Sequence, residues 1–206
     1  MVKDLTTRKQ LAKIRATKAV KIVAPAAVKL QMSQAKNTAI SHLLCDFSGS
    51  MGGEKEGYLK DAIRDLHPKF PGTTLVGFAS GEVDEFSIED LDYLRTQGGT
   101  PMMQALQFAW HNGARGIILI TDGEPDGSKE AILEMAMEYS HIPINPIGIG
   151  DGRYDFDAEF LRELARITGG EFHDVKESDL RFLTSTIETV LIGTDHGKGG
   201  GGAIIL

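Results

Sequence analysis

The chain has 206 residues, of which 41% are hydrophobic and 25% charged, a composition that suits one globular domain with an appendage. No apolar run approaches the roughly 20 residues of a membrane span, and no apolar core follows the basic N-terminus as it would in a secretory signal. The single cysteine, Cys45, excludes an internal disulfide, so we expect a protein of the reducing cytoplasm.

The net charge of −7 is unevenly distributed along the chain. Residues 1–36 hold nine Lys or Arg and one acid and carry +8, so the rest of the chain carries −15. We therefore expect a basic N-terminal extension attached to an acidic body. Three roles stay open for the extension: packing on the body, docking a partner protein, or contacting nucleic acid or an anionic membrane. Because residues 1–46 lack aromatic side chains, base stacking and thus nucleic-acid binding are poorly supported.

The two ends of the chain differ from its middle. The extension suits a helix in its first 20 residues, and residues 26–34 alternate apolar and polar side chains as a half-buried strand does. We expect this strand to be ordered against the acidic body, because opposite charges attract. Residues 194–206 are rich in glycine, which predicts a flexible tail.

Strand-like and helix-like segments alternate through residues 37–193, the predicted domain. In chain order we expect a strand at 40–47, a helix from 55 to about 68, a strand at 73–80, an antiparallel strand at 81–88, a helix at 101–114, a strand at 116–122, a helix at 128–140, a strand at 142–150, a helix at 157–170, a strand at 171–175 and a helix at 179–193. Several strands are continuous apolar runs, as in sheets covered on both faces. The fold class predicted is α/β: a doubly wound, mostly parallel six-stranded sheet with helices on both faces and one antiparallel edge strand.

Oxygen-bearing side chains follow the predicted strands. Asp46 and Asp122 each end a strand, Ser48 and Ser50 lie in the glycine loop after Asp46, and Thr100 precedes a helix. Ligands of open parallel sheets bind outside the carboxyl ends of the strands, so these side chains should meet there. Two carboxylates and three hydroxyls are the oxygen-only set that hard cations such as Mg²⁺ prefer, and a cation would also offset the repulsion between the acids.

Three short motifs resemble the von Willebrand factor A domain family. The stretch DFSGSM at 46–51 is similar to the family's D-x-S-G-S-M signature, GGTP at 98–101 to its threonine loop, and TDG at 121–123 to its second aspartate. Each motif alone is weak, because Asp, Ser and Gly are common in turns. Together and in this order, within a resemblance that covers roughly residues 40–193, they are specific.

The resemblance implies a metal-ion-dependent adhesion site. Its ligands, directly or through water, would be Asp46, Ser48, Ser50, Thr100 and Asp122. The cofactor implied is Mg²⁺, with Mn²⁺ or Ca²⁺ as alternatives, and an Asp or Glu of a partner protein commonly completes the coordination. The resemblance thus favours a protein-binding adaptor over an enzyme. Cytoplasmic members often serve in multiprotein assemblies, including ones driven by AAA-type ATPases.

Other residues and other functions stay open beside this interpretation. The rim of a binding face is expected to include Met51 and Gly99 within the motifs and Glu124 and Asp126 after them, although Met51 is equally compatible with the core. A phosphoryl-accepting role for Asp46 is disfavoured, because position 48 is Ser and no lysine falls in the motif loops.

The alternative function is a metal-assisted phosphohydrolase that uses the same cation to activate water. It needs a general base, for which the sequence offers Glu124, Asp126 or Asp151.

Overall fold

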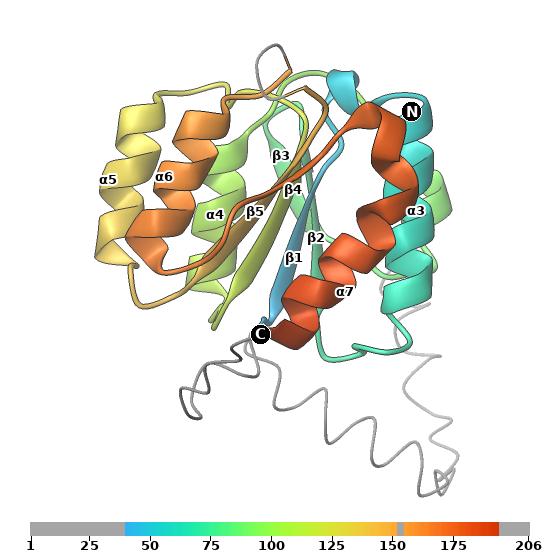
Figure 1. Ribbon diagram of the computed structural model, residues 1–206, viewed down its shortest axis with the longest axis horizontal. Coiled ribbons are helices and arrows are strands. Elements are labelled where there is room, and N and C mark those ends of the chain that lie inside the picture. Colours follow the sequence, from blue (N-terminus) through green and yellow to red (C-terminus); the bar gives the residue numbers. More distant parts are fainter. Residues whose placement is uncertain (1–39, 152–154, 194–206) are drawn as a thin grey trace, which may run out of the picture. The chain divides into compact units, whose positions relative to one another are not determined.

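The computed structural model describes residues 40–151 and 155–193. The predicted N-terminal helix, the predicted strand at 26–34 and the predicted flexible tail lie outside the described residues. Within them, six strands form one sheet in the order β3-β2-β1-β4-β5-β6 (Figure 1). The strands are β1 His42–Asp46, β2 Thr74–Ala79, β3 Glu82–Glu85, β4 Ile117–Thr121, β5 Ile144–Ile149 and β6 His173–Val175. Neighbouring strands are parallel except β3, which pairs antiparallel with β2 at the edge.

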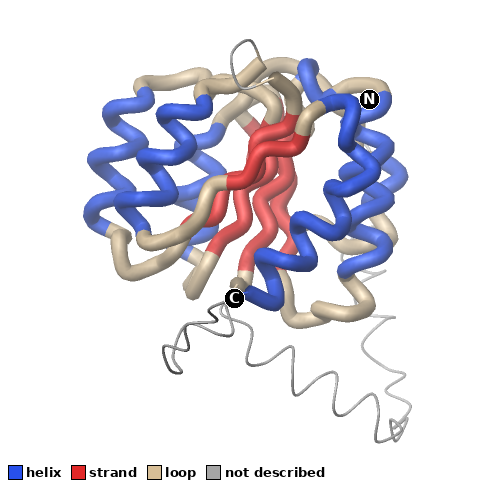
Figure 2. Tube along the Cα trace, viewed as in Figure 1, coloured by secondary structure: helices blue, strands red, loops and turns tan. Residues whose placement is uncertain are grey.

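Helices cover both faces of the sheet, so the predicted fold class is confirmed (Figures 1 and 2). The helices are α3 Glu54–Leu66, α4 Met102–His111, α5 Lys129–Glu138, α6 Ala158–Thr168 and α7 Leu183–Gly193. In Figure 1, α3 and α7 lie on one side of the sheet and α4, α5 and α6 on the other. Ser128 caps the N-terminus of α5, since its hydroxyl accepts a bond from Ala131 N–H at 3.2 Å.

The last helix begins later than the sequence predicted. Glu177–Phe182 form a 3₁₀ turn, η3, and α7 begins only at Leu183. The turn is closed by Asp179 N–H, which donates to the carbonyl of Lys176 at 2.8 Å. Its Ser and Asp residues compete for local backbone bonds and favour turns over a regular helix.

Burial in the strands explains why their sequences are almost wholly apolar. Every residue of β1 is buried, and successive side chains point to opposite faces: Leu43 and Cys45 pack with α3 and α7, and Leu44 packs with α4. Cys45 is fully buried, and this burial raises the pKa of its thiol. Each fully buried aliphatic side chain contributes roughly 1.5–3 kcal/mol relative to exposure, so both layers are firmly held to the sheet.

The amino-terminal edge of the sheet contains buried polar side chains that bond to backbone. Ser41 Oγ accepts a bond from Arg115 N–H at 2.8 Å, and Asn145 Oδ1 accepts one from Glu171 N–H at 2.9 Å. Thr168 Oγ1 accepts a bond from Ile144 N–H at 3.1 Å. These bonds give partners to backbone donors of two connecting segments and of the first residue of β5.

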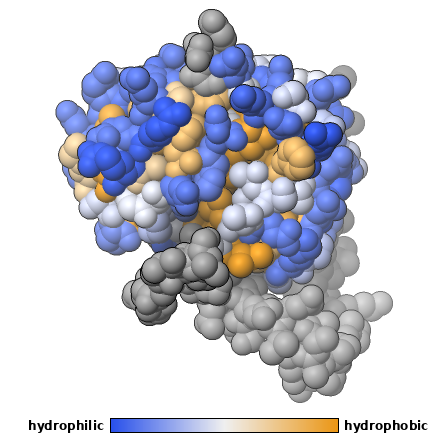
Figure 3. Space-filling view, in the orientation of Figure 1, coloured by the Kyte–Doolittle hydropathy of each residue, from blue (hydrophilic) through white to orange (hydrophobic). Residues whose placement is uncertain are grey.

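The molecular surface is mainly polar over the helices. On the face drawn in Figure 3, apolar side chains gather between α6 and α7, where the sheet lies between the two helical layers. None of the described helices combines the length and the hydropathy needed to span a bilayer.

Candidate functional site

The two predicted acids lie on adjacent strands at the carboxyl-terminal edge of the sheet. Cys45 of β1 is in register with Ile120 of β4, so Asp46 and Thr121 follow at the same level. Thr121 Oγ1 donates a hydrogen bond to Asp46 Oδ2 at 2.6 Å. Asp122 comes one residue later, so the strand pairing alone brings both carboxylates to one edge.

The loop after β1 connects these acids through hydroxyl groups. Ser48 N–H donates to Asp46 Oδ1 at 2.7 Å, which holds the start of the loop against the strand end. A 3₁₀ turn, η1 (Gly49–Met51), then places Ser50 Oγ 3.1 Å from Ser48 Oγ. Ser50 Oγ donates to Asp122 Oδ1 at 2.6 Å. The chain of polar contacts thus runs from one acid to the other.

Thr100 approaches the same point from the loop before α4. Gly49 N–H donates to the carbonyl of Gly98 at 2.9 Å and ties the two loops together. A Cβ atom built on Gly123 would lie 3.2 Å from Thr100 Oγ1 and 3.5 Å from Ser50 Oγ, so both hydroxyls face this glycine. The structure therefore brings all five predicted ligand residues together.

A lysine that the sequence analysis missed also belongs to this cluster. Lys55 Nζ lies 2.7 Å from Asp122 Oδ2 and 3.5 Å from Glu177 Oε1, and Lys55 is only 8% exposed. No lysine falls in the motif loops, as predicted from the sequence, but Lys55 reaches the acids from α3. One signal was available: α3 is the first α-helix after β1 and follows a short loop, so its first turn must start near this edge, and Lys55 is in that turn.

Burial and charge act on the ionisable groups in opposite directions. Burial raises the pKa of Asp46 to about 6, the bonds from Thr121 and Ser48 oppose this rise, and the charge of Asp122 adds to it. Burial alone would lower the pKa of Lys55, but the hydrogen bond and the charge of Asp122 outweigh it and raise that pKa. Lys55 is therefore a cation at neutral pH.

The donor set suits a hard divalent cation. Asp46 is 0% exposed, and no Lys, Arg or His among the described residues lies within 4.0 Å of its carboxylate. The same residues contain no group of three or more His, Cys, Asp and Glu that could hold a metal, so hydroxyls would have to supply part of the coordination. Two carboxylates with several hydroxyls suit Mg²⁺, which tolerates few protein carboxylates and keeps water ligands.

The predicted rim residues differ in how far their side chains are exposed. Glu124 and Asp126 are exposed, and the Asp126 carboxylate lies against the Cα of Gly99. Met51 is fully buried in the core beneath α3 and α7, so the prediction that it lines a binding face is wrong. The η1 turn is the physical reason, because it directs Met51 inward while Ser50 stays at the acids.

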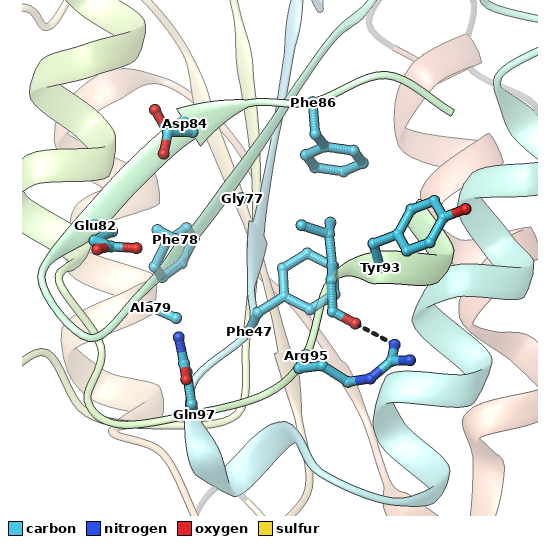
Figure 4. A pocket seen from close by; sticks show the side chains of 11 residues that line it. Phe47, Gly77, Phe78, Ala79, Glu82, Asp84, Phe86, Tyr93, Arg95 and Gln97 are labelled. Carbon is cyan, nitrogen blue, oxygen red and sulfur yellow. Dashed lines mark hydrogen bonds between the residues drawn. The ribbon is translucent and has the colours of Figure 1, made fainter. Parts of the chain in front are cut away.

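A separate hollow of about 400 Å³ lies beside these loops, at the β3 edge of the sheet (Figure 4). Its wall includes Phe47, Phe86, Tyr93 and Arg95, and none of the five predicted ligands lines it. A backbone bond connects the hollow to the strand end that carries Asp46, since Gln97 N–H donates to the carbonyl of Phe47, the residue after Asp46, at 2.8 Å. The polar cluster, rather than this hollow, is the candidate functional site.

Comparisons with known proteins agree with this fold. The sequence profile of the von Willebrand factor type A domain matches residues 65–174. The chain is 31% identical over 97 residues to human von Willebrand factor A domain-containing protein 3B, and 37% identical over 87 residues to human protein 3A of that name. These matches cover 45% and 39% of this chain and 7% of each relative.

A solved structure extends the likeness over more of the chain. The vWF domain of the type V pili tip protein Mfa5 from Porphyromonas gingivalis superposes with a TM-score of 0.54 at 12% identity, covering 80% of this chain and 98% of that one. At this sequence identity the superposition shows similarity of the fold alone. Because the profile match covers more than half of the sequence, the chain belongs to the von Willebrand factor type A domain family.

Proposed function

We propose that this domain is a metal-dependent protein-binding module. A divalent cation, Mg²⁺ or else Mn²⁺ or Ca²⁺, would be held by Asp46, Ser48, Ser50, Thr100 and Asp122. When bound, the cation would supply open coordination positions for a carboxylate of a partner protein. The function follows from membership in a family of interaction domains, while the metal and the carboxylate are inferred from the site.

One observation carries the proposal: Asp46 is a buried carboxylate whose described partners are neutral. It accepts bonds from Thr121 Oγ1 at 2.6 Å and Ser48 N–H at 2.7 Å, and both donors orient it toward the hydroxyl cluster. An ionised carboxylate without a cationic partner is costly to bury, and a cation among these oxygens offsets that cost.

The residues of the rim support binding over hydrolysis. Glu124, one of the general bases considered, pairs with Lys129 at 3.1 Å, and Asp126 lies against Gly99. Lys129 thus already engages the Glu124 carboxylate in an ion pair. The partner we propose is therefore a protein with an accessible Asp or Glu. An intracellular multiprotein assembly, such as one driven by an AAA-type ATPase, is the setting we propose.

Affinity capture from a native lysate tests this function. The wild-type chain, Asp46→Ala and Asp84→Ala would each be used as bait with Mg²⁺ and again with a chelator. We expect one set of partners that is retained by wild type and by Asp84→Ala, an exposed acid on β3, only when Mg²⁺ is present. Partners retained equally by Asp46→Ala or with the chelator would contradict the proposal.

An assay of phosphate-ester turnover separates the alternative function. Sustained hydrolysis that is lost in Asp122→Ala would replace the binding proposal with the hydrolase. We expect no turnover above that of buffer.

A further inference from the structure

Lys55 places a positive charge inside the group of residues proposed to bind a cation. Its ammonium lies 2.7 Å from Asp122 Oδ2, in a setting where the lysine is 8% exposed and the Asp122 side chain 0% exposed. Screening by water is weak at such a buried pair, so the charge acts strongly on anything bound beside Asp122.

The two acids of the site are consequently not equivalent. Asp46 accepts bonds from neutral donors, whereas Asp122 accepts one bond from Ser50 Oγ and another from the Lys55 ammonium. Asp46, Asp122 and Lys55 together carry a net charge of −1 rather than −2. A divalent cation therefore meets an acid pair that is already half neutralised.

We propose that Lys55 sets the cation affinity of the site by competing with the divalent cation for Asp122. This inference rests on the proposed function. A cation beside Asp122 is repelled by the ammonium and shares the carboxylate with it, so binding is weaker than two acids and three hydroxyls would otherwise allow. Glu177 lies on the exposed turn η3, 3.5 Å from Lys55 Nζ. It gives the ammonium a second acid and so weakens the interaction of Lys55 with Asp122.

A purely structural ion pair predicts the opposite result for Mg²⁺. If Lys55 only oriented Asp122, removing it would leave the carboxylate less well placed, and the affinity would fall or stay unchanged. If Lys55 competes, removing its charge strengthens binding. The sign of the change in affinity therefore separates the two roles.

Calorimetric titration of the full chain with Mg²⁺ alone provides the test. Lys55→Gln keeps a hydrogen-bond donor and removes the charge, and Lys55→Arg keeps the charge. Lys60→Gln is the matched control, because Lys60 is 7% exposed on the same helix but pairs with Glu56 and the carbonyl of Leu94. We expect Lys55→Gln to bind Mg²⁺ at least about tenfold more tightly, equivalent to about 1.4 kcal/mol, and the other two variants to stay within about twofold of wild type.

Several outcomes overturn the inference. If wild type binds Mg²⁺ and Lys55→Gln binds no more tightly, Lys55 does not compete, while the proposed function stands. If Lys60→Gln tightens binding as much as Lys55→Gln, the effect is not specific to Lys55. If neither wild type nor Lys55→Gln binds Mg²⁺, the proposed function itself fails.

A surface variant keeps the test decisive if Lys55→Gln does not fold. Glu177→Gln leaves the buried pair intact and removes the second acid, whose side chain is 66% exposed. With Asp122 left as the only described acid within 4.0 Å of its ammonium, Lys55 should compete more strongly, and we expect Mg²⁺ affinity to fall about twofold to fivefold. Unchanged or tighter binding in Glu177→Gln would then overturn the inference.

Discussion

The two edges of the sheet use buried polar side chains in different ways. At the amino-terminal edge, Ser41 and Asn145 each accept a bond from a backbone N–H of a connecting segment, and Thr168 accepts one from the N–H that begins β5. At the carboxyl-terminal edge, side chains bond mainly to one another, as Ser50 and Lys55 both do to Asp122. Backbone donors must be satisfied in any fold, but a cluster of acids and hydroxyls is not required by folding. The amino edge is thus organised for stability, whereas the carboxyl edge holds the polar cluster that we propose as the binding site.

The largest effect that tests this comparison is expected for Asp46→Ala. We predict that detectable Mg²⁺ binding disappears, because the acid without a cationic partner is lost. The free energy of unfolding should change by only about 1 kcal/mol, since Thr121 and Ser48 lose an acceptor while a buried charge is removed. Calorimetric titration and urea unfolding measure the two quantities, and unchanged Mg²⁺ affinity would mean that the ligand assignment is wrong.

Asn145→Ala should show the reverse pattern at the amino edge. Its side chain accepts a bond from Glu171 N–H at 2.9 Å and donates one to the carbonyl of Ile117 at 3.4 Å. We expect a loss of about 1–3 kcal/mol in the free energy of unfolding, because the part-buried N–H of Glu171 is left without its acceptor, and no change in Mg²⁺ affinity.

Asn112→Ala is the control for this second variant. Asn112 also bonds to backbone, donating to the carbonyl of Phe108 at 2.8 Å, but it lies at an exposed helix end. Asn112→Ala should lower the free energy of unfolding by less than about 0.5 kcal/mol, measured by urea unfolding. A similar cost at Asn145 would indicate that the amino edge is no more sensitive than the surface.

The smallest expected effect is an acid sensitivity of the amino edge at His42. Burial lowers the pKa of His42 below 6.5, its usual value, Glu85 opposes this shift and Arg115 adds to it. Above pH 6.5 the side chain is neutral whether the chain is folded or unfolded, so the full stability is present. As the pH falls below that value, the unfolded chain takes up a proton first and the folded state loses stability.

Urea unfolding between pH 7.5 and 5 checks this prediction with chelator present. We expect His42→Gln to reduce the loss of stability on acidification, while His111→Gln, at an exposed position, leaves it unchanged. An identical pH dependence in wild type and His42→Gln would show that His42 does not carry this sensitivity.

The architecture was predictable because apolar runs and their spacing determine it. Continuous apolar strands such as 116–122 and 142–150 require cover on both faces, and alternation with helices requires a parallel sheet. The meeting of Asp46 and Asp122 followed from the same reasoning, because both residues end parallel strands. The predictions for the N-terminal extension and for the tail concern residues outside those described, and they stay predictions.

The details that the sequence did not reveal depend on turn geometry and on contacts between distant segments. Met51 follows Ser50 directly, and only the η1 turn determines that one side chain faces the acids and the other the core. Lys55 is 67 residues from Asp122 along the chain, so its partner depends on how α3 packs at the edge of the sheet. A lysine in a first helical turn is unfavourable for the helix dipole, which was a second available hint of a specific acidic partner.

The buried thiol of Cys45 gives the molecule an internal reporter. Cys45 is the only cysteine of the 206-residue chain and immediately precedes Asp46 in the central strand. Its burial and raised pKa protect it from thiol reagents while β1 stays in place. Alkylation of the native chain can therefore proceed only through transient exposure of Cys45, so its rate measures how often the packing around β1, which carries Asp46, opens.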